Sequence, residues 1–222
     1  FSGFSLANNH TLDMGFANYD FTRTILEENN LFYFGHQTKE GTEYIYIAGE
    51  KESLPEKVAL IGLNNTDHPL NLTKVRESLN LAKEEARYVI VYMHWGNEYQ
   101  RISHSSQREF GRWLIDNGAT AVIGMHPHVI QEMEIYKNKP IFYSLGNFVF
   151  DQYFSQDTQE GISVGLNLLD GEIKTVYVFP FFSVKSQNSL MSGIRQKEFF
   201  DWWNKNSRLE GKFFINNRLE LN

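Results

Sequence analysis

Residues 88–98 read YVIVYMHWGNE, and this stretch decides the fold class. Its first six residues form a continuous apolar run, which is typical of a β-strand covered on both faces. Helical patterns lie on either side, at residues 72–87 and 106–116, where apolar side chains recur at three- and four-residue steps. A second short apolar run, TAVIG at 120–124, follows the second helix. This alternation of strands and helices predicts an α/β fold built in layers.

Weaker patterns extend this prediction toward the start of the chain. Residues 2–7, 43–49 and 57–63 resemble strands. Residues 16–29 resemble a helix that would bury Phe16, Tyr19, Ile25 and Leu26.

The pattern is different after residue 138. Residues 139–150 are strand-rich, and Asp170-Gly171 separates two alternating arms of a predicted β-hairpin. Residues 195–206 form a short amphipathic helix whose aromatic side chains we interpret as packing rather than as a ligand site. No repeat or linker divides the chain, so a single domain over 1–222 is expected, with its core at 1–180 and a C-terminal appendage at 181–222.

Composition limits the kinds of function. Apolar residues make up 41% of the 222 residues, so the chain can bury a sizeable core. The net charge of −6 and the lack of a basic run argue against nucleic acid as a partner. There is no cysteine, so a metal would have to bind imidazole, carboxylate, amide or water. No apolar run reaches the ~20 residues that span a bilayer.

Polar side chains suited to chemistry follow four of the apolar runs. Asn8, Asn9 and His10 follow the first run, His94 and Glu98 the run at 88–93, His126 and His128 the run at 120–124, and Asn147 the run at 141–146. Ligands of α/β sheets gather beyond the carboxyl ends of the strands. The four strand ends therefore predict one shared pocket.

The side chains at these positions favour a metal centre. Imidazole nitrogen binds Zn, Mn or Fe, and amide or carboxylate oxygen completes the coordination. Proline stiffens the backbone between His126 and His128, so each ring could serve one metal of a pair. Two metals ~3.5–4 Å apart can hold a phosphate and activate water. The other loop histidines, His36, His68 and His104, are interpreted as surface or hydrogen-bonded residues.

Four motifs carry a resemblance to a known family. SLANNHTLDMG (5–15), VYMHWGNEY (91–99), VIGMHPHVIQ (122–131) and PIFYSLGNFVFD (140–151) resemble the bacterial poly-gamma-glutamate capsule biosynthesis proteins of the CapA-like family. That family is similar to the calcineurin-like metallophosphoesterases. The resemblance covers roughly residues 1–180, and it implies a four-layer α/β/β/α sandwich in which two sheets are flanked by helices.

The resemblance also implies roles for single residues. Asn9, His94, His126 and His128 correspond to metal ligands, and His10 to the acid that protonates the leaving group. Asp13 and Glu98 are expected to assist catalysis, and Asn8, Trp95, Tyr99 and Asn147 to contact the substrate. The implied cofactors are divalent ions, Mn, Fe or Zn, at a centre typical of two metals.

The acidic ligands of the family pattern, a Gly-Asp strand and an Asn-Leu-Glu motif, do not occur between residues 1 and 222. We expect them upstream of Phe1, so this chain is interpreted as lacking its first strand or strands. Three histidines and one amide do not fill two metal shells, so one metal at most is expected. The missing strand would leave an open sheet edge, and a second copy of the chain could cover it.

Two functions remain open at this stage. In one, the intact protein is a metal-dependent hydrolase, or a related transferase or amide-cleaving enzyme, in capsule biosynthesis or export. It would act on poly-gamma-glutamate or on a phosphorylated small substrate, and this chain, without the acidic ligands, is expected to be impaired. The other is a non-catalytic assembly component that binds the polymer or other capsule-synthesis proteins. The resemblance implies a place at the extracytoplasmic face of the bacterial membrane, held by an anchor upstream of this chain.

Overall fold

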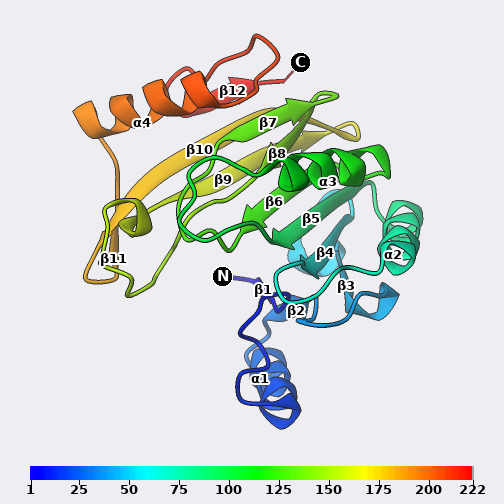
Figure 1. Ribbon diagram of the computed structural model, residues 1–222. Coiled ribbons are helices and arrows are strands. Elements are labelled where there is room, and N and C mark those ends of the chain that lie inside the picture. Colours follow the sequence, from blue (N-terminus) through cyan, green and yellow to red (C-terminus); the bar gives the residue numbers. More distant parts are fainter. Residues whose placement is uncertain (222) are drawn as a thin grey trace. The chain divides into compact units, whose positions relative to one another are not determined.

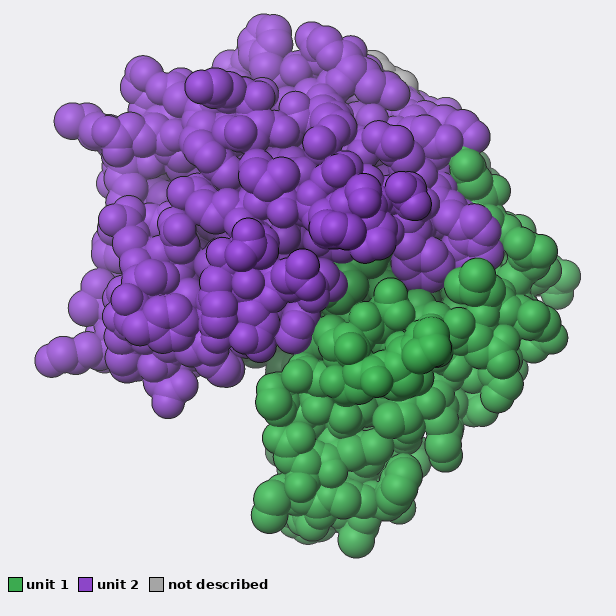
Figure 2. Space-filling model, in the orientation of Figure 1, with its two compact units in different colours: residues 1–95, 116–119 green, residues 96–115, 120–222 purple. Residues whose placement is uncertain are grey.

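The computed structural model describes residues 1–221, which contain four α-helices and twelve β-strands in a mixed α/β arrangement (Figure 1). The chain forms two compact units, coloured separately in Figure 2. Unit 1 comprises residues 1–95 and 116–119, and unit 2 comprises residues 96–115 and the chain from residue 120 onward. The expected single domain with a core at 1–180 and an appendage at 181–222 stays a prediction.

Unit 1 contains two groups of strands. β1 (Gly3–Ser5) and β2 (Phe32–Phe34) pair in parallel, and α1 (Phe16–Glu28) connects them. β3 (Ile45–Ala48) pairs antiparallel with β4 (Val58–Asn64), which pairs in parallel with β5 (Tyr88–His94) across the connection through α2 (Leu72–Glu85). Strands predicted at 2–7, 43–49, 57–63 and 88–93 are confirmed to within a few residues, whereas β2 was not predicted.

The two helices of unit 1 differ in how well their sequences predict their buried faces. In α2 the predicted apolar face is confirmed at Val75, Leu79 and Ala82, which are buried, and was wrong at Leu72, which is 51% exposed. In α1 only Tyr19 is buried, and the prediction for Phe16 and Ile25 was wrong, since these side chains are 59% and 40% exposed. The apolar residues of α1 are spread around the helix, so a single contact line cannot cover them.

Two glycines let the chain after β1 approach β4 closely. A Cβ atom on Gly62 would lie 3.0 Å from the Gly35 Cα atom and 3.1 Å from the Ala7 Cβ atom. Gly35 itself has a positive φ of 78°, a backbone angle that residues other than glycine rarely adopt. This close approach fixes the start of the loop that carries residues 8–13.

Unit 1 also buries a histidine among aromatic rings. His36 is 3% exposed, and its ring lies 4.8 Å from the Tyr19 ring and 5.2 Å from the Tyr44 ring, centroid to centroid. Its Nδ1 atom accepts a hydrogen bond of 3.0 Å from the Thr38 backbone N–H. Burial, and then the positive charges of Lys39, Arg23 and His68, lower the pKa of His36.

This histidine predicts a loss of stability in acid. The unfolded chain binds a proton at His36 more readily than the folded chain does, so stability falls as the pH drops below about 6.5. We expect His36→Gln to reduce the fall in the free energy of unfolding between about pH 7.5 and pH 5.5, measured by urea denaturation. His104→Gln is the control, because His104 is exposed. Equal pH dependence in wild type and His36→Gln would contradict this prediction.

Unit 2 contains three neighbouring strands that follow a helix in the chain. β6 (Ala121–Met125) pairs in parallel with β8 (Lys139–Phe142), which pairs antiparallel with β7 (Met133–Tyr136). α3 (Ser105–Asp116) precedes β6 and buries Leu114, as predicted, together with Ile115, which was not predicted. Phe110 and Trp113, which were also expected inside, are half-buried and stack on one another with ring centroids 5.4 Å apart.

The second sheet of unit 2 is built on the predicted hairpin. β9 (Glu160–Leu169) and β10 (Glu172–Val184) pair antiparallel, and Asp170 and Gly171 form the turn with φ values of 55° and 81°. Positive φ at both positions matches the twist of a two-residue hairpin turn. The other edge of β10 pairs with two short strands, β11 (Gln187–Leu190) and β12 (Arg218–Glu220), which were not predicted.

α4 (Gly193–Asn206) packs by its aromatic side chains, as the sequence predicts. Phe199, Phe200 and Trp203 are buried, and the Trp203 Nε1 atom donates a hydrogen bond of 3.2 Å to the Gln131 carbonyl. The chain after α4 then returns to β7, where the Ile135 N–H donates to the Arg208 carbonyl at 2.8 Å.

Candidate metal centre

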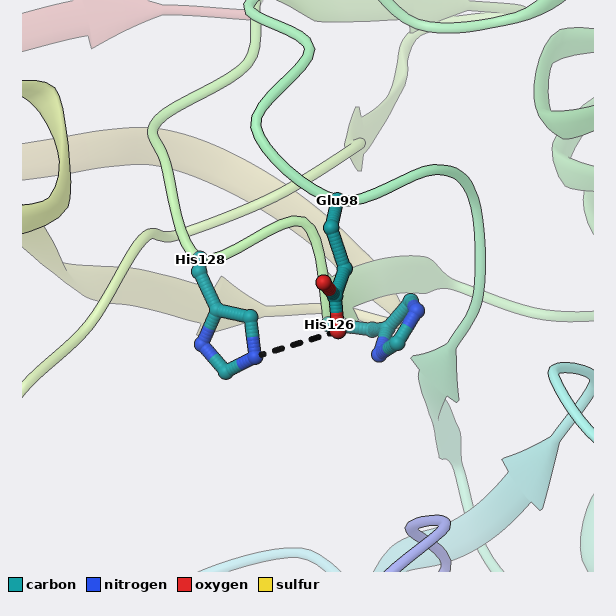
Figure 3. Close-up of side chains that lie close together, drawn as sticks. All are labelled: Glu98, His126 and His128. Carbon is teal, nitrogen blue, oxygen red and sulfur yellow. Dashed lines mark ion pairs between the residues drawn. The ribbon is translucent and has the colours of Figure 1, made fainter. Parts of the chain in front are cut away.

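Three metal-capable side chains meet in unit 2. Glu98, His126 and His128 each offer one ligand atom, and these atoms all lie within 4.8 Å of one another. The Glu98 Oε1 atom lies 4.0 Å from the His128 Nε2 atom. Figure 3 shows the Glu98 carboxylate between the two imidazole rings. The sequence analysis predicted all three residues, with Glu98 as a catalytic group rather than a ligand.

The backbone around this cluster is strained. His126 and His128 have φ values of 93° and 60°, and Tyr99 has a φ of 61°. Residues other than glycine rarely adopt such angles, and each instance costs about 1–3 kcal/mol. The Tyr99 N–H donates a hydrogen bond of 2.8 Å to the Pro127 carbonyl, so the segment with Glu98 is tied to the segment with both histidines. Strain of this kind clusters at functional sites.

The ring of His128 is held from several sides. Its Nδ1 atom lies 2.8 Å from Asn147 Oδ1. The Tyr99 ring stacks on it with centroids 6.0 Å apart, and the Phe150 ring lies at 5.4 Å. Partial burial and the nearby Glu98 carboxylate raise the pKa of the Tyr99 hydroxyl. These contacts restrict the ring to one orientation, with Nε2 on the side of Glu98.

A second group of predicted residues meets in unit 1. The Asn9 Oδ1 atom lies 2.8 Å from His94 Nε2, although the two residues are far apart in the chain. The Asn9 Nδ2 atom lies 3.2 Å from His10 Nε2, and the other ring nitrogen of His10 lies 2.9 Å from the Asp13 carboxylate. Because an amide Nδ2 only donates, His10 Nε2 accepts and His10 Nδ1 carries the proton toward Asp13.

The loop with Asn9 and His10 is held by a residue that the sequence analysis missed. Gln37 accepts a hydrogen bond of 2.7 Å from the Leu12 N–H and donates one of 2.8 Å to the Asn9 carbonyl. Asn8 Oδ1 accepts from the His10 N–H at 2.9 Å, so Asn8 shapes the turn. Nothing in the local sequence marks Gln37, because it lies more than twenty residues beyond the loop that it holds.

Four residues were expected to contact the substrate, and their surroundings differ. Tyr99 is 43% exposed and offers an accessible ring. Asn8 and Asn147 are engaged in the hydrogen bonds described above. Trp95 is 1% exposed, so its ring presents almost no surface to a substrate.

Exposed rings beside the cluster were not predicted either. Phe154 is 66% exposed and its ring lies 5.2 Å from that of Tyr99, and Phe150 is 43% exposed. Both are on the segment between β8 and β9. The apolar pattern FVF at 148–150 had been interpreted as part of a strand, which would bury alternate residues.

The unit 2 cluster fits a divalent metal. Two ligand atoms bound at about 2.1 Å to one tetrahedral Zn²⁺ lie about 3.4 Å apart. The 4.0 Å between Glu98 Oε1 and His128 Nε2 is longer, so a bound metal would have to draw the three ligand atoms closer together. Two imidazoles and one carboxylate leave a coordination position open, as catalytic zinc sites do. The geometry does not distinguish Zn from Mn or Fe.

Comparison with known proteins now decides the family. The model of a protein family described as "Bacterial capsule synthesis protein PGA_cap" matches residues 1–152. This range includes every predicted site residue. The chain belongs to the PGA_cap family. It is 30% identical over 199 residues to "Capsule biosynthesis protein CapA" of Bacillus anthracis, and 32% identical over 168 residues to "PGA biosynthesis protein CapA" of Bacillus subtilis.

These matches cover 81% and 68% of this chain but 47% and 43% of the two relatives. The chain therefore spans about half the length of these CapA relatives. A third similar protein, "Probable polyglutamine synthesis accessory protein Rv0574c" of Mycobacterium tuberculosis, is 27% identical over 202 residues, which are 78% of this chain and 50% of that protein.

A solved structure shares the fold of this chain and adds no function. The crystal structure of a hypothetical protein from Thermus thermophilus aligns with a TM-score of 0.54 and 14% identity. The alignment covers 81% of this chain and 76% of the other. Within residues 1–221, no helix has the length and apolar character to cross a membrane.

Proposed function

We propose that this chain carries the metal-binding part of a capsule biosynthesis protein that acts as a metal-dependent hydrolase. The observation that supports the proposal most directly is the Glu98, His126 and His128 cluster, whose three ligand atoms lie within 4.8 Å of one another. Such a centre supplies Lewis-acid polarisation of a phosphoryl or carbonyl oxygen and activation of water. We propose with it the metallophosphoesterase-like fold that the sequence analysis expected.

The residues of unit 1 have separate roles in this proposal. Asn9 and His94 form a second set of metal-capable atoms, 2.8 Å apart. His10 acts as the general acid that protonates the leaving group. Asp13 accepts a hydrogen bond of 2.9 Å from His10 Nδ1. The proton on Nδ1 stays in that bond, so Nε2 is the nitrogen that gains and loses the transferred proton.

The proposed substrate is poly-gamma-glutamate or a phosphorylated small molecule. The chain has a net charge of −6, and an anionic substrate would be repelled unless positive charge is concentrated where it binds. A divalent metal held by Glu98, His126 and His128 would supply that charge. Because a capsule lies outside the cell, we propose that the protein acts at the extracytoplasmic face of the membrane, together with other capsule-synthesis proteins.

A turnover assay tests the catalytic part. The chain is loaded with Mn²⁺ or Zn²⁺ and assayed with bis(p-nitrophenyl) phosphate, with and without a chelator. We expect metal-dependent hydrolysis that falls by about 10²–10⁴-fold in His10→Gln, because a general acid contributes that much.

The matched control is His104→Gln, since the His104 Nδ1 atom bonds only a neighbouring surface hydroxyl and a backbone N–H. Unchanged turnover in this variant is expected. Tight metal binding without hydrolysis, together with binding of poly-gamma-glutamate, would contradict the hydrolase and support an assembly component instead.

A further inference from the structure

Asn147 is fully engaged on both sides of its amide group. Its Nδ2 atom donates to the Thr158 carbonyl at 2.9 Å and to Gln152 Oε1 at 3.2 Å. A backbone carbonyl can only accept a hydrogen bond, so the side of the amide that faces Thr158 is the nitrogen. The oxygen of Asn147 must then face His128, where it lies 2.8 Å from Nδ1.

This orientation determines where His128 carries its proton. An amide oxygen can only accept, so His128 Nδ1 is the donor of the bond to Asn147. In the neutral ring the other nitrogen, Nε2, then has a free lone pair. That atom is the one that lies 4.0 Å from Glu98 Oε1, within the cluster. The Thr158 carbonyl therefore fixes the orientation of the Asn147 amide. That orientation in turn fixes which nitrogen of His128 has a lone pair for a metal.

We propose that Asn147 is a positioning residue: it holds His128 in the tautomer with the proton on Nδ1 and so presents Nε2 to the metal. The proposal rests on the metal-binding part of the proposed function, not on hydrolysis. It differs from the expected substrate contact of Asn147, because both amide hydrogens and one face of the oxygen are already used within the chain.

The surroundings of His128 make this bond the decisive one. The His128 ring also lies near the Tyr99, Phe150 and His126 rings, which restrict its plane, and the Glu98 carboxylate lies on the side of Nε2 rather than of Nδ1. Without the Asn147 oxygen, the proton is free to move to Nε2, where it would block metal binding. Outer partners of metal-bound histidines raise metal affinity by about 10–100-fold through this mechanism.

Two variants with side chains of similar size distinguish the effect of the hydrogen-bond acceptor from the effect of side-chain shape. Asn147→Leu removes the acceptor, and Asn147→Asp keeps an oxygen that accepts from Nδ1. We expect Zn²⁺ affinity, measured by titration calorimetry, to fall by about 10–100-fold in Asn147→Leu and to stay within about threefold in Asn147→Asp. Gln152→Leu is the control for the loop, since it removes only a contact of Asn147 Nδ2 and of the Tyr99 hydroxyl.

A second measurement needs no metal. The ¹⁵N chemical shifts of His128 report the tautomer directly at about pH 8, where imidazole is neutral. We expect the proton on Nδ1 in the wild type and in Asn147→Asp, and a shift of the proton toward Nε2 in Asn147→Leu. A proton on Nε2 in the wild type, or the same tautomer in all three proteins, would overturn the proposal.

The two measurements also distinguish the ways of failing. If the wild type binds no Zn²⁺ but shows the Nδ1 proton and its loss in Asn147→Leu, the metal proposal fails and the positioning role of Asn147 stands. If affinity falls equally in Asn147→Leu, Asn147→Asp and Gln152→Leu, the residue only maintains the loop and the positioning role is wrong. Should Asn147→Leu not fold, the wild-type tautomer still decides.

Discussion

Replacing His126 by alanine is expected to lower the affinity of this chain for Zn²⁺ or Mn²⁺ by more than about 100-fold. Loss of an outer partner of a metal ligand already costs about 10–100-fold, and loss of the ligand itself costs more. His126 supplies one of the three ligand atoms in the unit 2 cluster, so its removal leaves one imidazole and one carboxylate. Titration calorimetry on the wild type and on His126→Ala measures the difference.

Two further variants make this result specific. Glu98→Gln is expected to weaken binding as well, because it removes the negative charge that offsets the metal. His104→Ala is the control, as its ring nitrogen bonds only to residue 106 and the side chain is exposed. Equal metal affinity in His126→Ala and the wild type would show that the bound metal does not use this cluster.

The largest effect on stability is expected from Glu132→Ala. Glu132 is 0% exposed, and its two carboxylate oxygens accept hydrogen bonds from the Ser103 N–H at 2.9 Å and from the Ser103 hydroxyl at 2.6 Å. The Arg208 guanidinium donates a third at 3.0 Å. Removing the carboxylate leaves these donors without an acceptor and opens a cavity. Breaking a buried ion pair in this way costs about 3–5 kcal/mol.

Urea denaturation followed by circular dichroism measures this loss as a lower midpoint. Glu132→Gln should lose less, because it keeps an oxygen for Ser103. Asp201→Ala is the matched control: its 2.6 Å ion pair with Lys197 is on the surface, so the midpoint should hardly change. A midpoint in Glu132→Ala equal to that of Asp201→Ala would show that the buried pair adds nothing to stability.

The candidate site was predictable because its residues follow a local rule. Polar side chains directly after a buried strand lie at the edge where ligands bind, and this placed Glu98, His126 and His128 among the candidates from the sequence alone. In the structure the ligand atoms of these three residues lie within 4.8 Å of one another. The resemblance to capsule proteins added roles, since it marked His126 and His128 as ligands.

The partners of those residues were not predictable. Asn147 faces His128 across 19 positions, and Gln37 reaches back 28 positions to the Asn9 carbonyl. Neither pairing produces a periodic pattern in the sequence. A hydrogen bond between two loops that are distant in the chain depends on where the fold places both loops. The same reason explains why β11 and β12 were missed. They are short, and they exist as strands because the free edge of β10 pairs with them.

The sequence by itself determined the α/β class, the strongly periodic elements such as α2, β5 and the hairpin at Asp170-Gly171, and the residue types able to bind a metal. Those features follow from backbone preferences and from apolar spacing, which act over a few residues. Only the tertiary structure decided which nitrogen of His128 faces Glu98, and that Trp95 is buried. Such outcomes depend on contacts between segments far apart in the chain, and local spacing does not specify them.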